Sequence, residues 1–159
     1  DILLGYAEAL NEISGSYNIS SWDSAQTYTI ARSTEEMRKG IRPVRIRAGI
    51  PDFSDAVYSS NTALRKAIKR ERQVELMGEQ ERYYDLRRWE DAATELALPI
   101  YGYNVLMTSN QRDLFHQPVA AFALQSTFAP KMYFWPISIT ELQRDKRLTQ
   151  NPGWQTYNN

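Results

Sequence analysis

A highly charged helix spans the middle of the chain, and its charges constrain the fold more than any other feature. At helical spacing, Glu71 and Glu75 fall on a side that also carries apolar residues, namely Leu64, Ile68 and Val74. An unpaired buried carboxylate costs several kcal/mol, so cations must lie close by. Nearby arginines are the available partners: Arg72, Arg82, Arg87 and Arg88.

We therefore predict a structural ion-pair network that holds the helices together and in which removal of Glu75 lowers stability sharply. Its predicted members are Glu71, Arg72, Glu75, Arg82 and Asp85. A second interpretation is catalytic, because Cβ atoms at i and i+4 lie about 6 Å apart, within reach of the roughly 5 Å carboxyl separation of a retaining glycosidase. Adjacent arginines would lower a carboxyl pKa, whereas a catalytic acid needs a raised one. We predict no catalytic residue and keep a glycoside hydrolase as the less favoured alternative.

The composition excludes several classes of partner and cofactor. Lys plus Arg and Asp plus Glu number 19 each, which removes the net positive charge needed for nucleic acid or an anionic membrane surface. The chain has 159 residues, no cysteine and one histidine, His116. We therefore predict no metal site and no cofactor. No apolar run reaches membrane-spanning length, and the first residues do not form a signal peptide.

Hydrophobic periodicity predicts helices at residues 2–13, 34–48, 62–79 and 81–96. The apolar face of the first is predicted to hold Leu3, Tyr6, Ala7, Leu10 and Ile13. Residues 14–33 are rich in Ser, Asn and Thr and are predicted to form a long loop. Prolines break residues 97–159 into irregular pieces that include a few short strands, and the aromatic runs 101–103 and 133–135 are predicted to be buried.

Aromatic residues in the polar segment 14–33 are the best candidates for ligand contact. An aromatic face packs on the C–H groups of a sugar ring, while neighbouring polar groups bond its hydroxyls. The candidate ligand-binding residues are Trp22, Tyr28, Tyr17 and Asp23. The alternative is that the aromatic side chains anchor the loop on the helices.

Three sequence motifs occur in a fixed order. The first is Val44-Arg45-x-Arg47-Ala48-Gly49-Ile50-Pro51. The second is Glu71-Arg72-x-x-Glu75-Leu76 with Arg82-x-x-Asp85-Leu86-x-Arg88-Trp89, and the third is Phe134-Trp135-Pro136-Ile137 with Gln150-Asn151-Pro152-Gly153-Trp154. Together they resemble the SusD/RagB family, the nutrient-binding lipoproteins of the bacterial outer membrane. One departure is Gln80, which stands where the family has Gly in the turn between two helices.

The resemblance implies a fold and a domain organisation. The expected fold is all-α, with tetratricopeptide-like helix pairs at about 2–48 and 62–96 and an irregular C-terminal region with a few short strands at about 97–159. Because family members are longer, residues 1–159 are expected to be the C-terminal portion of a SusD-like domain, with the N-terminal portion absent.

The resemblance also implies a function. We expect non-catalytic binding of glycan oligosaccharides, or of peptides, for delivery to a SusC-like TonB-dependent outer-membrane transporter. The expected location is the cell surface, with membrane association only through an N-terminal lipid anchor outside this chain. The alternative is a helical-repeat scaffold that binds protein partners and no small molecule.

Overall fold

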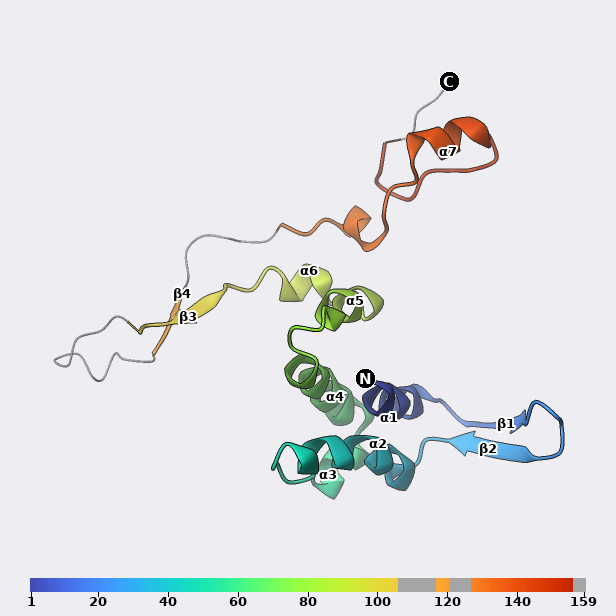
Figure 1. The fold of residues 1–159 in the computed structure, drawn as a ribbon, viewed down its shortest axis with the longest axis vertical. Helices are drawn as coiled ribbons and strands as arrows, with labels where there is room; N and C mark the ends of the chain where they lie inside the picture. The colour runs from blue at the N-terminus through green and yellow to red at the C-terminus, as the bar shows by residue number, and fades with distance from the viewer. Residues whose placement is uncertain (106–116, 121–126, 156–159) are drawn as a thin grey trace. The chain divides into compact units, whose positions relative to one another are not determined.

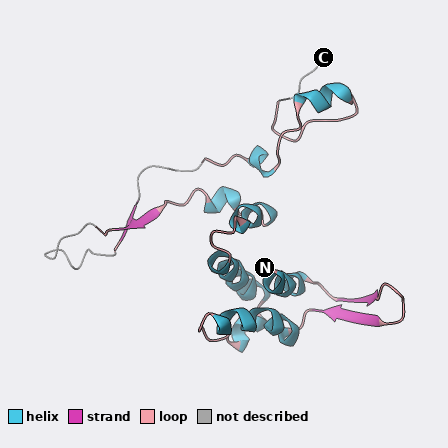
Figure 2. Cartoon of the chain, in the orientation of Figure 1, coloured by secondary structure: helices cyan, strands magenta, loops and turns pink. Residues whose placement is uncertain are grey.

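The computed structural model describes residues 1–105, 117–120 and 127–155 (Figure 1). It contains two compact units, Asp1–Arg82 and Tyr83–Asn159. Helices dominate the described residues, and two antiparallel two-stranded sheets accompany them (Figure 2). The fold is therefore mostly helical, but it is not purely all-α as predicted.

Three helices build the core of the N-terminal unit. Helix α1 (Ile2–Glu12) packs against both α2 (Thr34–Arg47) and α4 (Asn61–Glu75), and the short α3 (Asp55–Ser59) contacts α2 and α4. Their buried side chains form one apolar cluster: Leu4, Ala7, Leu10, Met37, Ile41, Tyr58, Leu64 and Ile68. The predicted first and second helices thus pack together, while the tetratricopeptide-like arrangement of a second pair stays a prediction.

Gly40 marks the closest approach of α1 and α2. A Cβ atom at this position would overlap the main-chain oxygen of Leu3 and lie 3.1 Å from Cβ of Ala7. This crossing point selects which face of α1 is buried. Leu4 and Asn11 are buried and Leu3 and Tyr6 are exposed, so the predicted face of this helix is wrong by about one residue. Sequence periodicity cannot separate the two faces, because Leu3 and Leu4 both fit an apolar stripe.

Residues 14–33 form a hairpin instead of the predicted loop. Strand β1 (Ser16–Ser20) pairs with β2 (Thr27–Ala31) in antiparallel register. Aromatic and β-branched residues alternate with polar ones in both strands, which favours a strand. The high content of Ser, Thr and Asn concealed that alternation. In Figure 2 the hairpin projects away from the helices of its unit.

A buried polar cluster fixes the base of the hairpin. The fully buried Asn11 side chain donates to the main-chain oxygen of Asn61 (3.0 Å), and the Asn61 side chain donates to the main-chain oxygen of Asn11. Arg32, which follows β2, donates to Oδ1 of Asn11 (3.0 Å) and to the main-chain oxygen of Tyr58 (2.7 Å). Buried polar groups must be paired, so this cluster sets where the chain leaves the core.

Two helix ends differ from the predicted boundaries. Helix α4 ends at Glu75 rather than 79, and the following turn holds two left-handed residues, Gly78 with φ +89° and Gln80 with φ +65°. The predicted helix 81–96 is broken into α5 (Glu81–Arg88) and α6 (Ala92–Glu95). At the break Glu90 takes φ +58°. Left-handed conformations cost L-residues about 1–2 kcal/mol, and nothing in the composition of this segment signals that the chain adopts them.

The C-terminal unit is built from short elements. After α5 and α6, strand β3 (Tyr101–Tyr103) pairs with β4 (Pro118–Ala120), and the 3₁₀ helix η2 (Pro130–Tyr133) precedes α7 (Ile139–Arg144). The Tyr133 hydroxyl donates to the Glu90 main-chain oxygen (2.8 Å) and joins η2 to the break between α5 and α6. Four aromatic residues predicted to be buried are more than half exposed: Tyr101, Tyr103, Phe134 and Trp135.

The helix crossing yields a prediction with a control in the same pair of helices. Replacing Gly40 by Ala should lower the free energy of unfolding by roughly 1–3 kcal/mol, because overpacking against the α1 backbone outweighs the gain in helix propensity. Gly5→Ala in α1 meets no atom within 4 Å and should be neutral or stabilising by up to about 1 kcal/mol. Urea denaturation of both variants measures the difference, and equal stabilities would contradict the close crossing.

Candidate functional site

The carboxylates of α4 are paired with arginines of α2. Arg45 Nη1 lies 2.5 Å from Glu71 Oε2, and both side chains are nearly buried, with 13% and 12% exposed. Arg47 pairs with Glu75 in a more exposed position. The compensating cations were predicted within residues 72–88, but these two arginines come from the preceding motif. Their signal was the pair of arginines two positions apart at the end of α2.

Arg45 also determines how the chain leaves α2. Its Nε donates to the main-chain oxygen of Pro51 (2.8 Å), and its guanidinium lies 3.8 Å from the ring centroid of Phe53. The turn between them requires a left-handed residue, which Gly49 supplies with φ +73°. One arginine thus joins the end of α2, the turn and α4, so a structural role accounts for this motif.

Two other predicted members of the network, Arg72 and Asp85, are buried and take part in ion pairs. Arg72 is buried and pairs with Asp1 at 2.6 Å, while the buried Asp85 pairs with Arg88 of its own helix at 2.7 Å. Arg82 is half-buried in the first turn of α5. Val74, predicted on the buried side of α4, is exposed, and the buried stripe is Leu64, Ile68 and Arg72. A single network that joins all five predicted residues stays a prediction.

The predicted ligand residues gather on the hairpin. Tyr28 pairs with Ile19, which is two residues from Tyr17, so Tyr17 and Tyr28 lie on the same face of the hairpin. Trp22 lies in the loop between the strands and is 97% exposed. Such exposure means that Trp22 does not anchor the loop on the helices. Asp23 accepts hydrogen bonds from the Ser21 hydroxyl (2.5 Å) and the Ala25 amide (3.1 Å), and the Ser21 hydroxyl bond is the main cause of the lowered pKa of this carboxyl.

The third motif closes on itself through side-chain amides. Gln150 Oε1 accepts from the Ile137 amide (2.8 Å) and its Nε2 donates to the Ile137 carbonyl (3.0 Å), so this side chain pairs with a backbone as a strand would. Asn151 donates to the Trp135 carbonyl (2.6 Å), and the Trp154 indole donates to the Phe134 carbonyl (3.0 Å). We name this closure the amide clasp. It explains Gln, Asn and Trp in the motif without a ligand.

The remaining candidate sites concern metal ions and the membrane. Both Asp52 and Asp55 bind the guanidinium of Arg38, at 2.9 and 2.6 Å. In the described residues, no group of three or more His, Cys, Asp and Glu side chains is arranged to hold a metal ion. His116 lies outside the described residues. No helix in the described parts of the chain combines the length and the apolar character that crossing a membrane requires.

Burial predicts unequal contributions from the two α2–α4 ion pairs, in contrast to the emphasis on Glu75 in the sequence analysis. Glu71→Ala should cost roughly 3 kcal/mol of unfolding free energy, because it strands Arg45 in a nearly buried position. Glu75→Ala should cost no more than about 1 kcal/mol, since two-thirds of the Arg47 side chain is exposed to solvent. Chemical denaturation provides the comparison, and a larger loss for Glu75→Ala would refute this ranking.

The amide clasp is testable at two main-chain amides. Gln150→Leu removes the oxygen that accepts from Ile137 and Asn151, so their hydrogen exchange, followed by NMR, should accelerate about fivefold, as expected for a bond worth about 1 kcal/mol. Gln150→Glu keeps an acceptor oxygen and serves as the control, with both amides still protected. Unchanged exchange in the leucine variant would show that the clasp does not form.

Comparisons with known proteins agree on one family. The family model described as the SusD family matches residues 1–154. Among solved structures, BT4246 is 30% identical to this chain, with a TM-score of 0.61. The match covers 76% of this chain and 20% of the BT4246 chain. A SusD-like protein (BF3747) from Bacteroides fragilis NCTC 9343 is 25% identical with a TM-score of 0.65, covering 96% of this chain and 24% of its own.

The chain therefore spans only about a fifth to a quarter of the length of these structures. Among curated proteins, none matches it. The family model nevertheless covers nearly every residue described above, including all three motifs whose contacts are resolved here. The chain belongs to the SusD family.

Proposed function

We propose that this protein binds oligosaccharides, or peptides, at the outer-membrane surface without cleaving them and delivers them to a SusC-like TonB-dependent transporter. The observation that carries the proposal is the family match over residues 1–154. SusD family proteins are non-catalytic binding proteins of nutrient uptake and are lipoproteins of the outer-membrane surface. Because the chain spans a small part of the matched structures, its ligand, its partner and its location are proposals.

The geometry of the α4 carboxylates supports a binding protein over a glycoside hydrolase. A catalytic acid must carry a proton that it gives to the leaving group. Glu71 instead accepts a charge-assisted hydrogen bond from Arg45 at 2.5 Å in a nearly buried position, so this carboxylate is engaged in the contact between α2 and α4. Glu75 is likewise occupied by Arg47. Both carboxylates serve the contact between helices.

The motifs support the same conclusion from another direction. The arginines of the first motif and the carboxylates of the second motif bind each other, and the third motif forms the amide clasp. These contacts hold a scaffold together and leave ligand recognition to other surfaces. In such a protein, residues that recognise the ligand can vary while the scaffold keeps its form.

The proposed function predicts binding without turnover. In calorimetry, the intact protein should bind at least one member of a panel of oligosaccharides and peptides with modest affinity, because an open polar site gains little over water and the ligand loses conformational freedom. Chromatography after long incubation should recover the ligand unchanged. A pull-down from outer-membrane extract should recover a large TonB-dependent barrel.

Each part of this proposal fails separately. If the ligand is shortened during incubation, and is still shortened when Glu71 is replaced by Gln, a catalytic site lies elsewhere in the protein and the non-catalytic assignment is wrong. Recovery of soluble protein partners without a barrel would favour a helical-repeat scaffold. Binding of no oligosaccharide and no peptide would remove the nutrient-capture role.

A further inference from the structure

The hairpin presents an apolar face that no other described part of its unit covers fully. The register pairs Tyr17 with Ile30 and Ile19 with Tyr28, so all four side chains lie on the same face. Ile30 packs against the helical core. Tyr17, Ile19 and Tyr28 are 54%, 51% and 53% exposed, and we name these three the aromatic face. Ile19 was not among the predicted residues, although its period-two alternation with Tyr17 indicates it.

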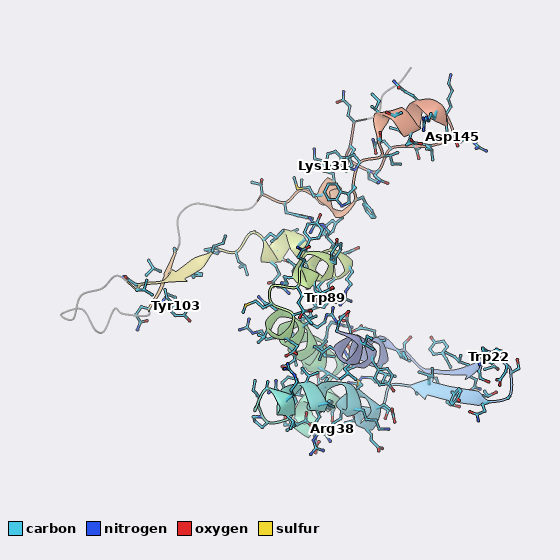
Figure 3. All side chains as sticks on the ribbon, in the orientation of Figure 1. Trp22, Arg38, Trp89, Tyr103, Lys131 and Asp145 are labelled. Atoms are coloured by element: carbon cyan, nitrogen blue, oxygen red, sulfur yellow. The ribbon has the colours of Figure 1, made fainter. Side chains whose placement is uncertain are left out.

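Trp22 lies in the loop that joins the two strands of the hairpin. Figure 3 shows its side chain at the tip, remote from the helices of its unit. An indole that is 97% exposed buries almost no apolar area, so core packing does not explain it. A large aromatic side chain left in water next to other exposed apolar residues is typical of a contact surface.

Hydrogen bonds hold this surface in a defined shape. At the tip the Ser21 amide donates to the Gln26 carbonyl (2.8 Å), and Asp23 accepts from Ser21 and Ala25. At the base Arg32 binds Asn11 and the Tyr58 carbonyl. A two-stranded hairpin is marginally stable alone, and these bonds give it a fixed geometry before any ligand arrives. Preorganisation lowers the entropic cost of binding.

Area and charge both limit what this surface can bind. With about 150–250 Å² per aromatic side chain, the exposed parts of the aromatic face and Trp22 amount to on the order of 500 Å². A stable protein interface buries about 800 Å² per partner, so the surface is small for a folded protein. Asp23 is the only charged residue between Ser16 and Ala31, and its negative charge disfavours an anionic ligand.

We propose that the aromatic face and Trp22 form a contact surface for a neutral oligosaccharide. This proposal rests on the function proposed above and narrows its ligand class. The C–H faces of the sugar rings stack on Trp22 and on the tyrosines. Gln26 accepts a hydrogen bond from the Tyr28 hydroxyl, and its amide nitrogen can donate to a sugar hydroxyl.

The test measures binding by the intact protein and its variants in calorimetry. The neutral probes are maltohexaose, cellohexaose, xylohexaose and mannohexaose, the anionic probe is hexagalacturonate, and the peptide probe is a casein digest. Trp22→Ala should weaken binding of the neutral probe that the wild type binds by about two- to tenfold, the range expected for one aromatic contact. Trp22→Phe should retain more affinity than Trp22→Ala, because it keeps an aromatic ring.

Thr27→Val is the matched control, because Thr27 lies on the opposite face of the same hairpin and valine keeps the β-branch. It should bind as the wild type does. Quenching of tryptophan fluorescence by acrylamide tests whether Trp22 is accessible in the free intact protein. The wild type should show a strongly quenched component that is absent from Trp22→Phe. If another part of the protein shields Trp22, the surface is not a ligand site and the proposal is overturned.

The remaining outcomes separate this proposal from the broader function. Equal affinities for wild type and Trp22→Ala would overturn the hairpin surface and leave oligosaccharide capture in place. Preference for hexagalacturonate, or loss of casein-peptide binding alone in Trp22→Ala, would overturn the neutral-sugar assignment. Binding of no sugar probe by the wild type would overturn both the surface and the oligosaccharide function.

Discussion

The close crossing of α1 and α2 at Gly40 sets the geometry of the N-terminal unit. The backbones of α1 and α2 approach closely at this point, and α1 contacts α4 as well. The same packing brings the end of α2 beside α4, where Arg45 meets Glu71. Burial of Asn11 on α1 then provides the acceptor for Arg32 at the base of the hairpin. A larger side chain at position 40 would displace α1 from α2. Because protein interiors are close-packed and transmit displacement, the Arg45–Glu71 and Arg32–Asn11 contacts would shift with it.

The three motifs that identify the family are contacts of the scaffold. Arg45 and Glu71 come from different motifs and form one ion pair, so the two motifs depend on each other physically. Gln150 and Ile137 come from the two halves of the third motif and form one paired unit. In a family of binding proteins, this division lets the frame stay constant while ligand contacts lie elsewhere. The hairpin lies outside all three motifs, and it is the surface that we propose for such contacts.

Sequence periodicity predicted the existence of the main helices but not their faces or ends. It placed helices near α1, α2 and α4, where the apolar spacing is clear and where, for α2 and α4, a serine caps the first turn. It misplaced the buried face of α1 and the break at Glu90, because both are decided by a tertiary contact or a left-handed residue that no local pattern encodes. Glu71 and Glu75 were correctly seen to need cations, whereas their partner helix was not predicted. Trp22, Tyr17 and Tyr28 were singled out within a loop, but their grouping required the strand register.

The amide clasp has a consequence for how this end of the protein tolerates change. Its bonds join side chains of Gln150 and Asn151 to main-chain groups of Ile137 and Trp135, and every residue type carries those main-chain groups except for the amide that proline lacks. Residues 138–149, which the clasp encloses, contribute no fully buried side chain. Substitutions within residues 138–149 should therefore change the stability little. Substitutions at Gln150 and Asn151 should change it more, because these two side chains close the segment.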